Sequence, residues 1–167
     1  VFAAKAMVEQ MKGHKAKIVA IIDGLAASAA TTIAIGADEV RMAPGGQFMI
    51  HNAWSFVGGD YRDMARMSDV LKKVNYSIVQ EYAGKTGKSQ AQIEDWMNAE
   101  TWFNADEALA NGFIDSIVEH APKATNMWDL SGYDKVPKAL LETQPKNEDT
   151  FDIEHLQRHL KMLERIA

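Results

Sequence analysis

The feature that most constrains the fold is a short apolar run rich in β-branched residues, KIVAIID at residues 17–23. Runs of this kind are typical of strands that are covered on both faces, as in a parallel sheet. Residues 27–37, ASAATTIAIGA, favour a helix, because alanine is the best helix former and small side chains let a helix lie close to a sheet. Two short strands are predicted at 38–43 and 47–53, around the turn Pro44-Gly45-Gly46. This order of elements indicates an α/β fold.

The other predicted elements of the core are mostly helices. Apolar residues at helical spacing predict a helix over 1–12, ended by Gly13, and a long helix over about 60–83, ended by Gly84. Two capping boxes predict short helices, one through Trp96 and one ending at Gly112, and a strand returns after them. The boxes are Ser89 with Gln92 and Asn104 with Glu107, and the strand is FIDSIVE at 113–119.

The last part of the chain differs in composition. Residues 121–149 are polar and contain three prolines, so they predict an irregular arm. Apolar residues then repeat at three and four positions up to Ala167, which predicts a helix that forms a coiled-coil seam, docks on a partner or folds back onto its own core. The predicted organisation is therefore a core over 1–119, an extended arm over 120–149 and an amphipathic C-terminal helix over 150–167.

Composition excludes several classes of function. A net charge of −5 provides no basic field for nucleic acid. The absence of cysteine excludes disulfides, thiol catalysis and zinc–thiolate sites, and fits a reducing compartment. No apolar run reaches membrane-spanning length and no signal peptide is visible. We therefore expect a soluble cytoplasmic protein without nucleic-acid or membrane partners.

Ser28 is the only polar residue in GLAASAA at 24–30, directly after the predicted strand. It suits close helix packing, a turn or a nucleophile, and a nucleophilic serine needs a histidine as its base. Of five histidines, His51 alone ends an apolar strand, FMIHN. Parallel strands that lie side by side would bring both residues to the same edge of the sheet, although His51 could also be a purely structural residue there. Spacing leaves the third group of such a triad open among Asp95, Glu100 and Asp106.

Three segments of the sequence together resemble the Clp peptidase family of serine proteases. They are KIVAIIDGLAASAATTIAIGA, FMIHNAW and ETWFNADEALANGFIDSIVE. They are similar to the family's GxxAS nucleophile turn, its MIH histidine strand and its late xxFxSAxEAxxxGLxD segment, in the same order. The resemblance covers about residues 1–119. The arm and the terminal helix lie outside it and, with ETWFNADEALANG, are similar to the phage and prophage branch, whose members act as prohead proteases in capsid maturation.

The resemblance implies a ClpP/crotonase-like spiral of β-α units and a set of site residues. It makes Ser28 the nucleophile, His51 the general base and then acid, and Glu100 the acid where the family has aspartate. The N–H of Ala29 would form half of the oxyanion hole. The other half would come from a segment preceding Val1, so the 167-residue chain alone is expected to be weak or inactive.

The function expected from the resemblance is that of a serine endopeptidase without metal or cofactor. Its substrate would be a polypeptide such as a capsid or scaffold protein. The chain would assemble as a homo-oligomeric ring. The resemblance leaves open whether an ATP-dependent unfoldase is a partner. Residues 54–62 would join the long helix between two rings, or would form a plain solvent loop. Two alternatives remain at this stage: a non-catalytic structural or assembly subunit of a ring, and a crotonase-like acyl-CoA enzyme.

Overall fold

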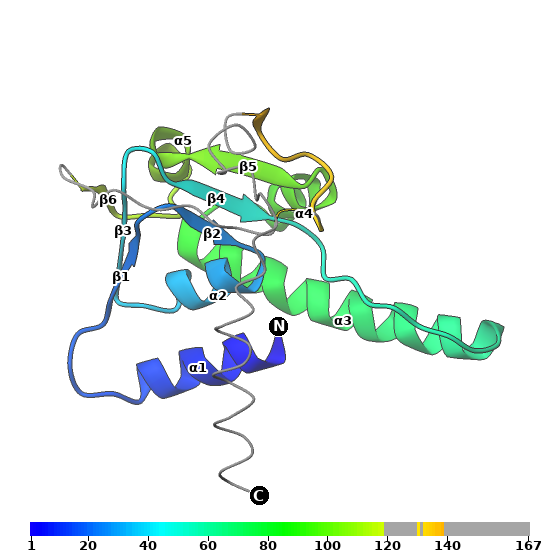
Figure 1. Cartoon of the computed structure of the whole chain (residues 1–167). Helices are drawn as coiled ribbons and strands as arrows, with labels where there is room; N and C mark the ends of the chain where they lie inside the picture. The colour runs from blue at the N-terminus through cyan, green and yellow to red at the C-terminus, as the bar shows by residue number, and fades with distance from the viewer. Residues whose placement is uncertain (119–129, 131, 139–167) are drawn as a thin grey trace, which may run out of the picture.

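The structure is a computed structural model that describes residues 1–118, 130 and 132–138 (Figure 1). The predicted C-terminal helix and most of the predicted arm lie outside the described residues. Within the described part, no helix is both long enough and apolar enough to cross a membrane.

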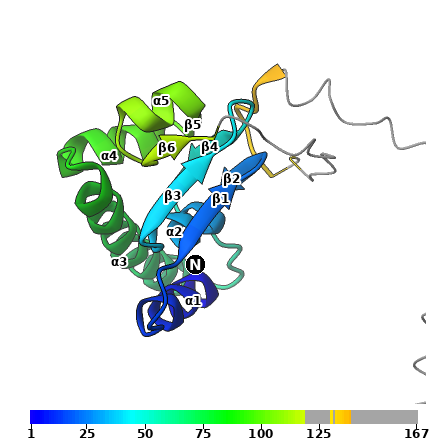
Figure 2. The same ribbon diagram turned by 90° about the vertical axis from the view of Figure 1, so that its left-hand side faces the viewer.

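Among the described residues, six short strands form two small sheets. In the first sheet, strands β1 (Val19–Ile22), β3 (Glu39–Met42) and β6 (Ser116–Ile117) are parallel, in the order β1-β3-β6. In the second, β2 (Leu25–Ala27) is parallel to β4 (Gln47–Ile50), which pairs antiparallel with β5 (Thr101–Asn104). Since β1 leads into β2 and β3 into β4, the chain passes twice from the first sheet to the second in the same direction (Figure 2).

Five helices in the part of the chain up to residue 118 surround these sheets. They are α1 (Phe2–Lys12), α2 (Ala29–Ile35), α3 (Tyr61–Thr86), α4 (Gln90–Asn98) and α5 (Ala105–Ala110). The C-terminal half of α3 belongs to the core through Ile78, Val79 and Tyr82, whereas its N-terminal half extends away from the sheets (Figure 1). The predicted apolar stripe is therefore longer than the buried face, and its members Met64 and Val70 are exposed.

Aromatic side chains fill the core between the second sheet and helices α3 and α4. The rings of Phe48 and Phe103 each lie 4.9 Å from that of Phe113, and Tyr82 and Trp96 contact the same ring from α3 and α4. Phe48 on β4 also pairs across the sheet with Phe103 on β5. The cluster therefore fixes both strands against the helices.

Most predicted elements are confirmed, but the end of the long helix is not where the sequence predicted it. Helix α3 continues past Gly84 to Thr86 and ends at Gly87, which has a φ of 69°. Glycine adopts this left-handed conformation without the steric penalty of a Cβ atom, so Gly87 is the better helix terminator. Gly84 lies inside the helix, where an added Cβ would meet nothing within 4 Å.

Two of the strands were not predicted from the sequence, and the structure differs from the prediction in three further details. Strands β2 and β5 lie in GLAAS and ETWFN, for which no strand was predicted, and β5 makes the second sheet mixed rather than parallel. Within the predicted strand at 113–119, only β6 is regular. Helix α4 runs beyond Trp96 to Asn98, and Ser89 caps it by accepting from the Gln92 N–H, without the reciprocal bond of a capping box among the described residues. The Asn104–Glu107 capping box is confirmed.

Two glycine-to-alanine substitutions should change stability in opposite directions. A Cβ on Gly36 would lie 2.6 Å from the Val8 side chain of α1, so Gly36→Ala should lower the free energy of unfolding by about 1–3 kcal/mol. Gly84→Ala should raise it by about 0.5–1 kcal/mol, because it restricts the unfolded chain and meets no neighbour. Chemical denaturation of both variants measures the difference, and equal effects would contradict this account of the α1–α2 contact.

Candidate active site

Ser28 lies at the junction of β2 and α2 in an uncommon backbone conformation. Its φ is 56° and its ψ is −124°, and positive φ is rare for a residue other than glycine. The Ser28 N–H donates to the carbonyl of Met49 in β4, at 3.0 Å. The side chain makes no capping bond to α2, so its hydroxyl is directed elsewhere. Strain of this kind persists only where surrounding contacts hold the residue, and it occurs often at functional sites.

Two buried hydroxyl groups hold the carbonyl of Ser28. The Thr31 hydroxyl donates to this carbonyl at 2.5 Å, and its oxygen lies 2.6 Å from the hydroxyl of Tyr82 on α3. Since the only hydroxyl proton of Thr31 is used on Ser28, Tyr82 is the donor in the second bond. Burial raises the pKa of Tyr82 to about 12. Tyr82 therefore stays protonated and keeps donating.

His51 follows β4 and faces the Ser28 hydroxyl. Its Nε2 atom lies 2.8 Å from Ser28 Oγ, within hydrogen-bond distance. The cause is the parallel pairing of β2 with β4, which aligns Ala27 with Met49 and so brings the residues after both strands to the same edge. Burial lowers the pKa of His51, and the charge of Glu100 partly opposes this. Because its pKa is lowered, the imidazole is neutral at neutral pH and can accept a proton.

Glu100 lies near His51, but among the described residues no hydrogen bond joins the two. Its carboxylate instead accepts from the backbone N–H groups of Lys135, at 2.8 Å, and Asp134, at 3.2 Å. Burial acts to raise the pKa of Glu100, but these two bonds, a bond from Trp102 and the His51 charge together lower it. Glu100 is therefore an ionised group that acts on His51 through its charge.

The two other candidates for the third group are placed differently. Asp95 is exposed on α4, and Asp106 is exposed in the first turn of α5. The charge that acts on the pKa of His51 is that of Glu100. Ala29 is the first residue of α2, where a backbone N–H has no partner within the helix.

The sequence did not indicate the part played by residues 132–135. The Tyr133 ring lies 5.6 Å from the His51 ring and 5.9 Å from that of Trp102, in edge-on contacts. Burial raises the pKa of Tyr133, and the charge of Glu100 adds to this. No local pattern marks a tyrosine in a polar segment as a neighbour of a histidine 82 positions away, so only a long-range signal could have identified it.

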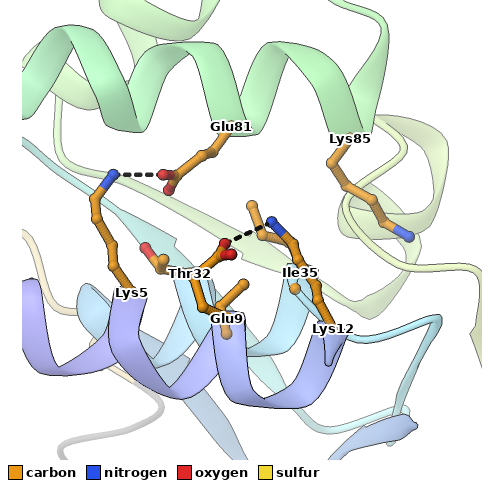
Figure 3. Close-up of a pocket in the computed structure, with 9 residues that line it drawn as sticks. Lys5, Glu9, Lys12, Thr32, Ile35, Glu81 and Lys85 are labelled. Carbon is orange, nitrogen blue, oxygen red and sulfur yellow. Dashed lines mark hydrogen bonds and ion pairs between the residues drawn. The ribbon is translucent and has the colours of Figure 1, made fainter. Parts of the chain in front are cut away.

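Two cavities lie near these elements. One, of about 500 Å³, is open to solvent beside His51, and Trp54, Phe56, Met97 and Gly132 are among the residues that line it. The other, of about 400 Å³, lies between α1, α2 and α3, where Lys5 and Glu81 point toward each other (Figure 3). Ser28, His51 and Glu100 do not line this second cavity. Within the described ranges, no three acidic or histidine side chains gather as a metal site would.

Comparison with known proteins identifies the family. A sequence model described as Clp protease matches residues 1–121, which include Ser28, His51 and Glu100. The chain belongs to the Clp protease family. The mixed α/β fold with small sheets is that of the Clp protease family, as expected from the sequence.

Curated relatives support membership of the Clp protease family. Proteins named ATP-dependent Clp protease proteolytic subunit from Streptococcus equi subsp. equi (strain 4047) and Streptococcus pyogenes serotype M5 (strain Manfredo) are 37% and 35% identical to this chain over 124 residues. In each case the match covers 72% of this chain and 63% of the relative. The chain thus spans less than two thirds of the length of these relatives.

Removing the Thr31 hydroxyl should destabilise this Clp family site. Thr31→Val should lower the free energy of unfolding by about 1–3 kcal/mol, because the buried Tyr82 hydroxyl loses its acceptor at 2.6 Å. Tyr82→Phe added to Thr31→Val should recover part of this loss, since no buried donor remains. Denaturant titration of the single and double variants measures the coupling free energy between the Thr31 and Tyr82 hydroxyls. Strictly additive effects would show that the two hydroxyls do not act as a pair.

Proposed function

We propose that the protein is a serine endopeptidase in which Ser28 is the nucleophile and His51 is the general base. The observation that carries this proposal is the 2.8 Å contact between Ser28 Oγ and His51 Nε2, at the carboxyl ends of two adjacent parallel strands. A serine hydroxyl becomes an effective nucleophile when a positioned base removes its proton. Membership of the Clp protease family supports the same assignment.

In the first half of the proposed reaction, Ser28 Oγ attacks the carbonyl carbon of the scissile peptide bond while its proton passes to His51 Nε2. The carbonyl oxygen becomes an oxyanion, and the N–H of Ala29 donates to it. The C–N bond then breaks as His51 gives its proton to the leaving amine, which leaves an acyl group on Ser28.

In the second half, water attacks the acyl group and His51 takes a proton from it. Breakdown of this second tetrahedral species returns the proton to Ser28 and releases the new carboxyl end of the substrate. In both halves His51 becomes positively charged, and the ionised carboxylate of Glu100 stabilises that charge. Glu100 thus takes the part of the third group electrostatically rather than through a hydrogen bond.

The substrate and assembly belong to the same proposal. The open cavity beside His51 has an apolar lining and suits a side chain of an extended polypeptide. Trp54 and Phe56 are 60% and 89% exposed next to α3, which supports burial of this surface between copies of the chain in a ring. The narrower assignments, namely cytoplasmic capsid maturation by a phage-type enzyme and action with an unfoldase, rest on the sequence resemblance alone.

An active-site probe tests the nucleophile. A fluorophosphonate probe should label Ser28 in the full-length protein, and Ser28→Ala should abolish both labelling and peptide hydrolysis. His51→Ala should lower kcat by on the order of 10⁶-fold, as loss of the base does in other serine proteases. Ser116→Ala, on strand β6, is the matched serine control and should label normally. Equal labelling of Ser28→Ala and the unchanged protein would refute the assignment.

The pH dependence tests the base. Burial lowers the pKa of His51, and the imidazole must be neutral to accept the serine proton. Activity should therefore be retained as the pH falls to about 6.5, the ordinary histidine value, and should be lost only below it. The acid limb of kcat/KM, measured with a short peptide, reports this pKa. An acid limb clearly above 6.5 would contradict a base with the burial described here.

A non-catalytic ring subunit is the second candidate. One observation favours it: the Glu100 carboxylate is bonded to the backbone of residues 134 and 135, whereas a typical triad acid bonds to the histidine. In this case the full-length protein would assemble normally but would neither react with the probe nor cleave peptides. A crotonase-like acyl-CoA enzyme has no comparable support, because such an enzyme has no need of the Ser28–His51 contact.

A further inference from the structure

The third group of the proposed triad has an unusual support. Glu100 precedes β5 with a φ of 50°, a left-handed conformation that a residue with a side chain rarely adopts. Its carboxylate accepts two backbone N–H groups from one turn, Asp134 and Lys135. The Lys135 ammonium group donates, at 2.7 Å, to the carbonyl of Ala99, the residue that precedes Glu100. Three hydrogen bonds thus join the turn at 133–135 to the Ala99–Glu100 corner.

A glutamate needs such support more than an aspartate would. Its side chain has one more rotatable bond, and fixing a glutamate side chain costs up to about 2 kcal/mol in rotamer entropy. Without a partner the carboxylate can turn into solvent, where its charge is screened from the imidazole. Bonds from N–H groups to a carboxylate are of the strong, charge-assisted kind. The turn therefore supplies two strong bonds that a longer acid at this position requires.

We infer that the turn at Tyr133–Lys135 is a positioning element of the active site, which holds the Glu100 carboxylate beside His51 through its backbone N–H groups. This inference rests on the proposed function. The turn lies outside the residues that match the Clp protease model, so a segment beyond the family core completes the site. The Tyr133 ring of the same turn lies 5.6 Å from the imidazole, in an edge-on contact.

Among the described residues, the charged and titratable groups near His51 come from the start of β5 and from the turn at 133–135. Glu100 comes from the start of β5, and Tyr133 comes from the turn. Asp134 and Lys135 line the cavity that His51 also lines, and Lys135 is bonded to Ala99. Releasing the turn should therefore act on His51 mainly through the position of the Glu100 charge.

Removal of one N–H group tests the inference in the full-length protein. Lys135→Pro deletes the donor at 2.8 Å, because proline has no backbone N–H. It should lower kcat by on the order of 10²-fold with little change in KM, since misplacement of a catalytic group costs about that much. It should also move the acid limb of kcat/KM to lower pH, because the Glu100 charge no longer supports the imidazolium. Lys138→Pro makes the same change three residues along, at an N–H without a hydrogen bond to Glu100, and should do neither.

Glu100→Gln tests the same interaction from the side of the carboxylate, because it removes the charge that the Lys135 N–H holds in place. It should shift the acid limb in the same direction, and Lys135→Pro added to Glu100→Gln should cause no further shift, since both changes remove one interaction. An unchanged or faster kcat in Lys135→Pro, or shifts that add, would overturn the inference. Asp134→Pro, which deletes the second donor, replaces Lys135→Pro if that variant does not fold.

Hydrogen exchange tests the contact between Glu100 and the turn without a proline variant and without an activity assay. In Glu100→Ala the amides of Asp134 and Lys135 lose their acceptor and should exchange faster, whereas Asp95→Ala, at an exposed position on α4, should leave them protected. Unchanged protection in Glu100→Ala would overturn the inference. Because this readout needs no substrate, the inference can fail while Ser28 labelling succeeds, and the proposed function can fail while the contact is verified.

Discussion

The candidate site depends on the parallel pairing of β2 with β4. This pairing aligns Ala27 with Met49, so that Ser28 and His51 leave the sheet at the same edge. The bond from the Ser28 N–H to the Met49 carbonyl continues the pairing one residue beyond the strand. A shift in register by one residue would turn the side chains to the opposite face and separate the hydroxyl from the imidazole. The Ser28–His51 contact, on which the proposed chemistry depends, therefore follows from the register of three residue pairs between β2 and β4.

Local signals in the sequence predicted the parts of the fold that local physics determines. The run at 17–23 contains strand β1 and the Asn104–Glu107 capping box appears as expected. Two details differ: Val19 and Ile21 of β1 are exposed rather than covered, and the helix predicted over 27–37 begins only at Ala29, because Ala27 pairs with β4. These patterns depend on residues within one or two turns of each other. The approach of Ser28 to His51 was also expected, because parallel strands present their carboxyl ends together. The catalytic roles of the two residues remain a proposal.

Long-range contacts account for what the sequence did not predict. Strands β2 and β5 are only three and four residues long, and they are strands because they pair with β4 rather than because of their composition. Gly84 looked like a helix end, but the packing of Tyr82 and its neighbours keeps α3 helical through it. The bonds to Glu100 come from residues 34 and 35 positions later in the chain, and no spacing rule covers such a distance.

Ser28 and Glu100 are held by the same principle. Both are residues with side chains at positive φ, and in both the strain is balanced by hydrogen bonds from other elements. For Ser28 the support is buried in the core, through Thr31 and Tyr82, and it shares the stability of the aromatic cluster. For Glu100 the support is an exposed turn outside the core. The proposed nucleophile is thus held by the fold itself, whereas the proposed acid is held by a turn that lies outside both sheets.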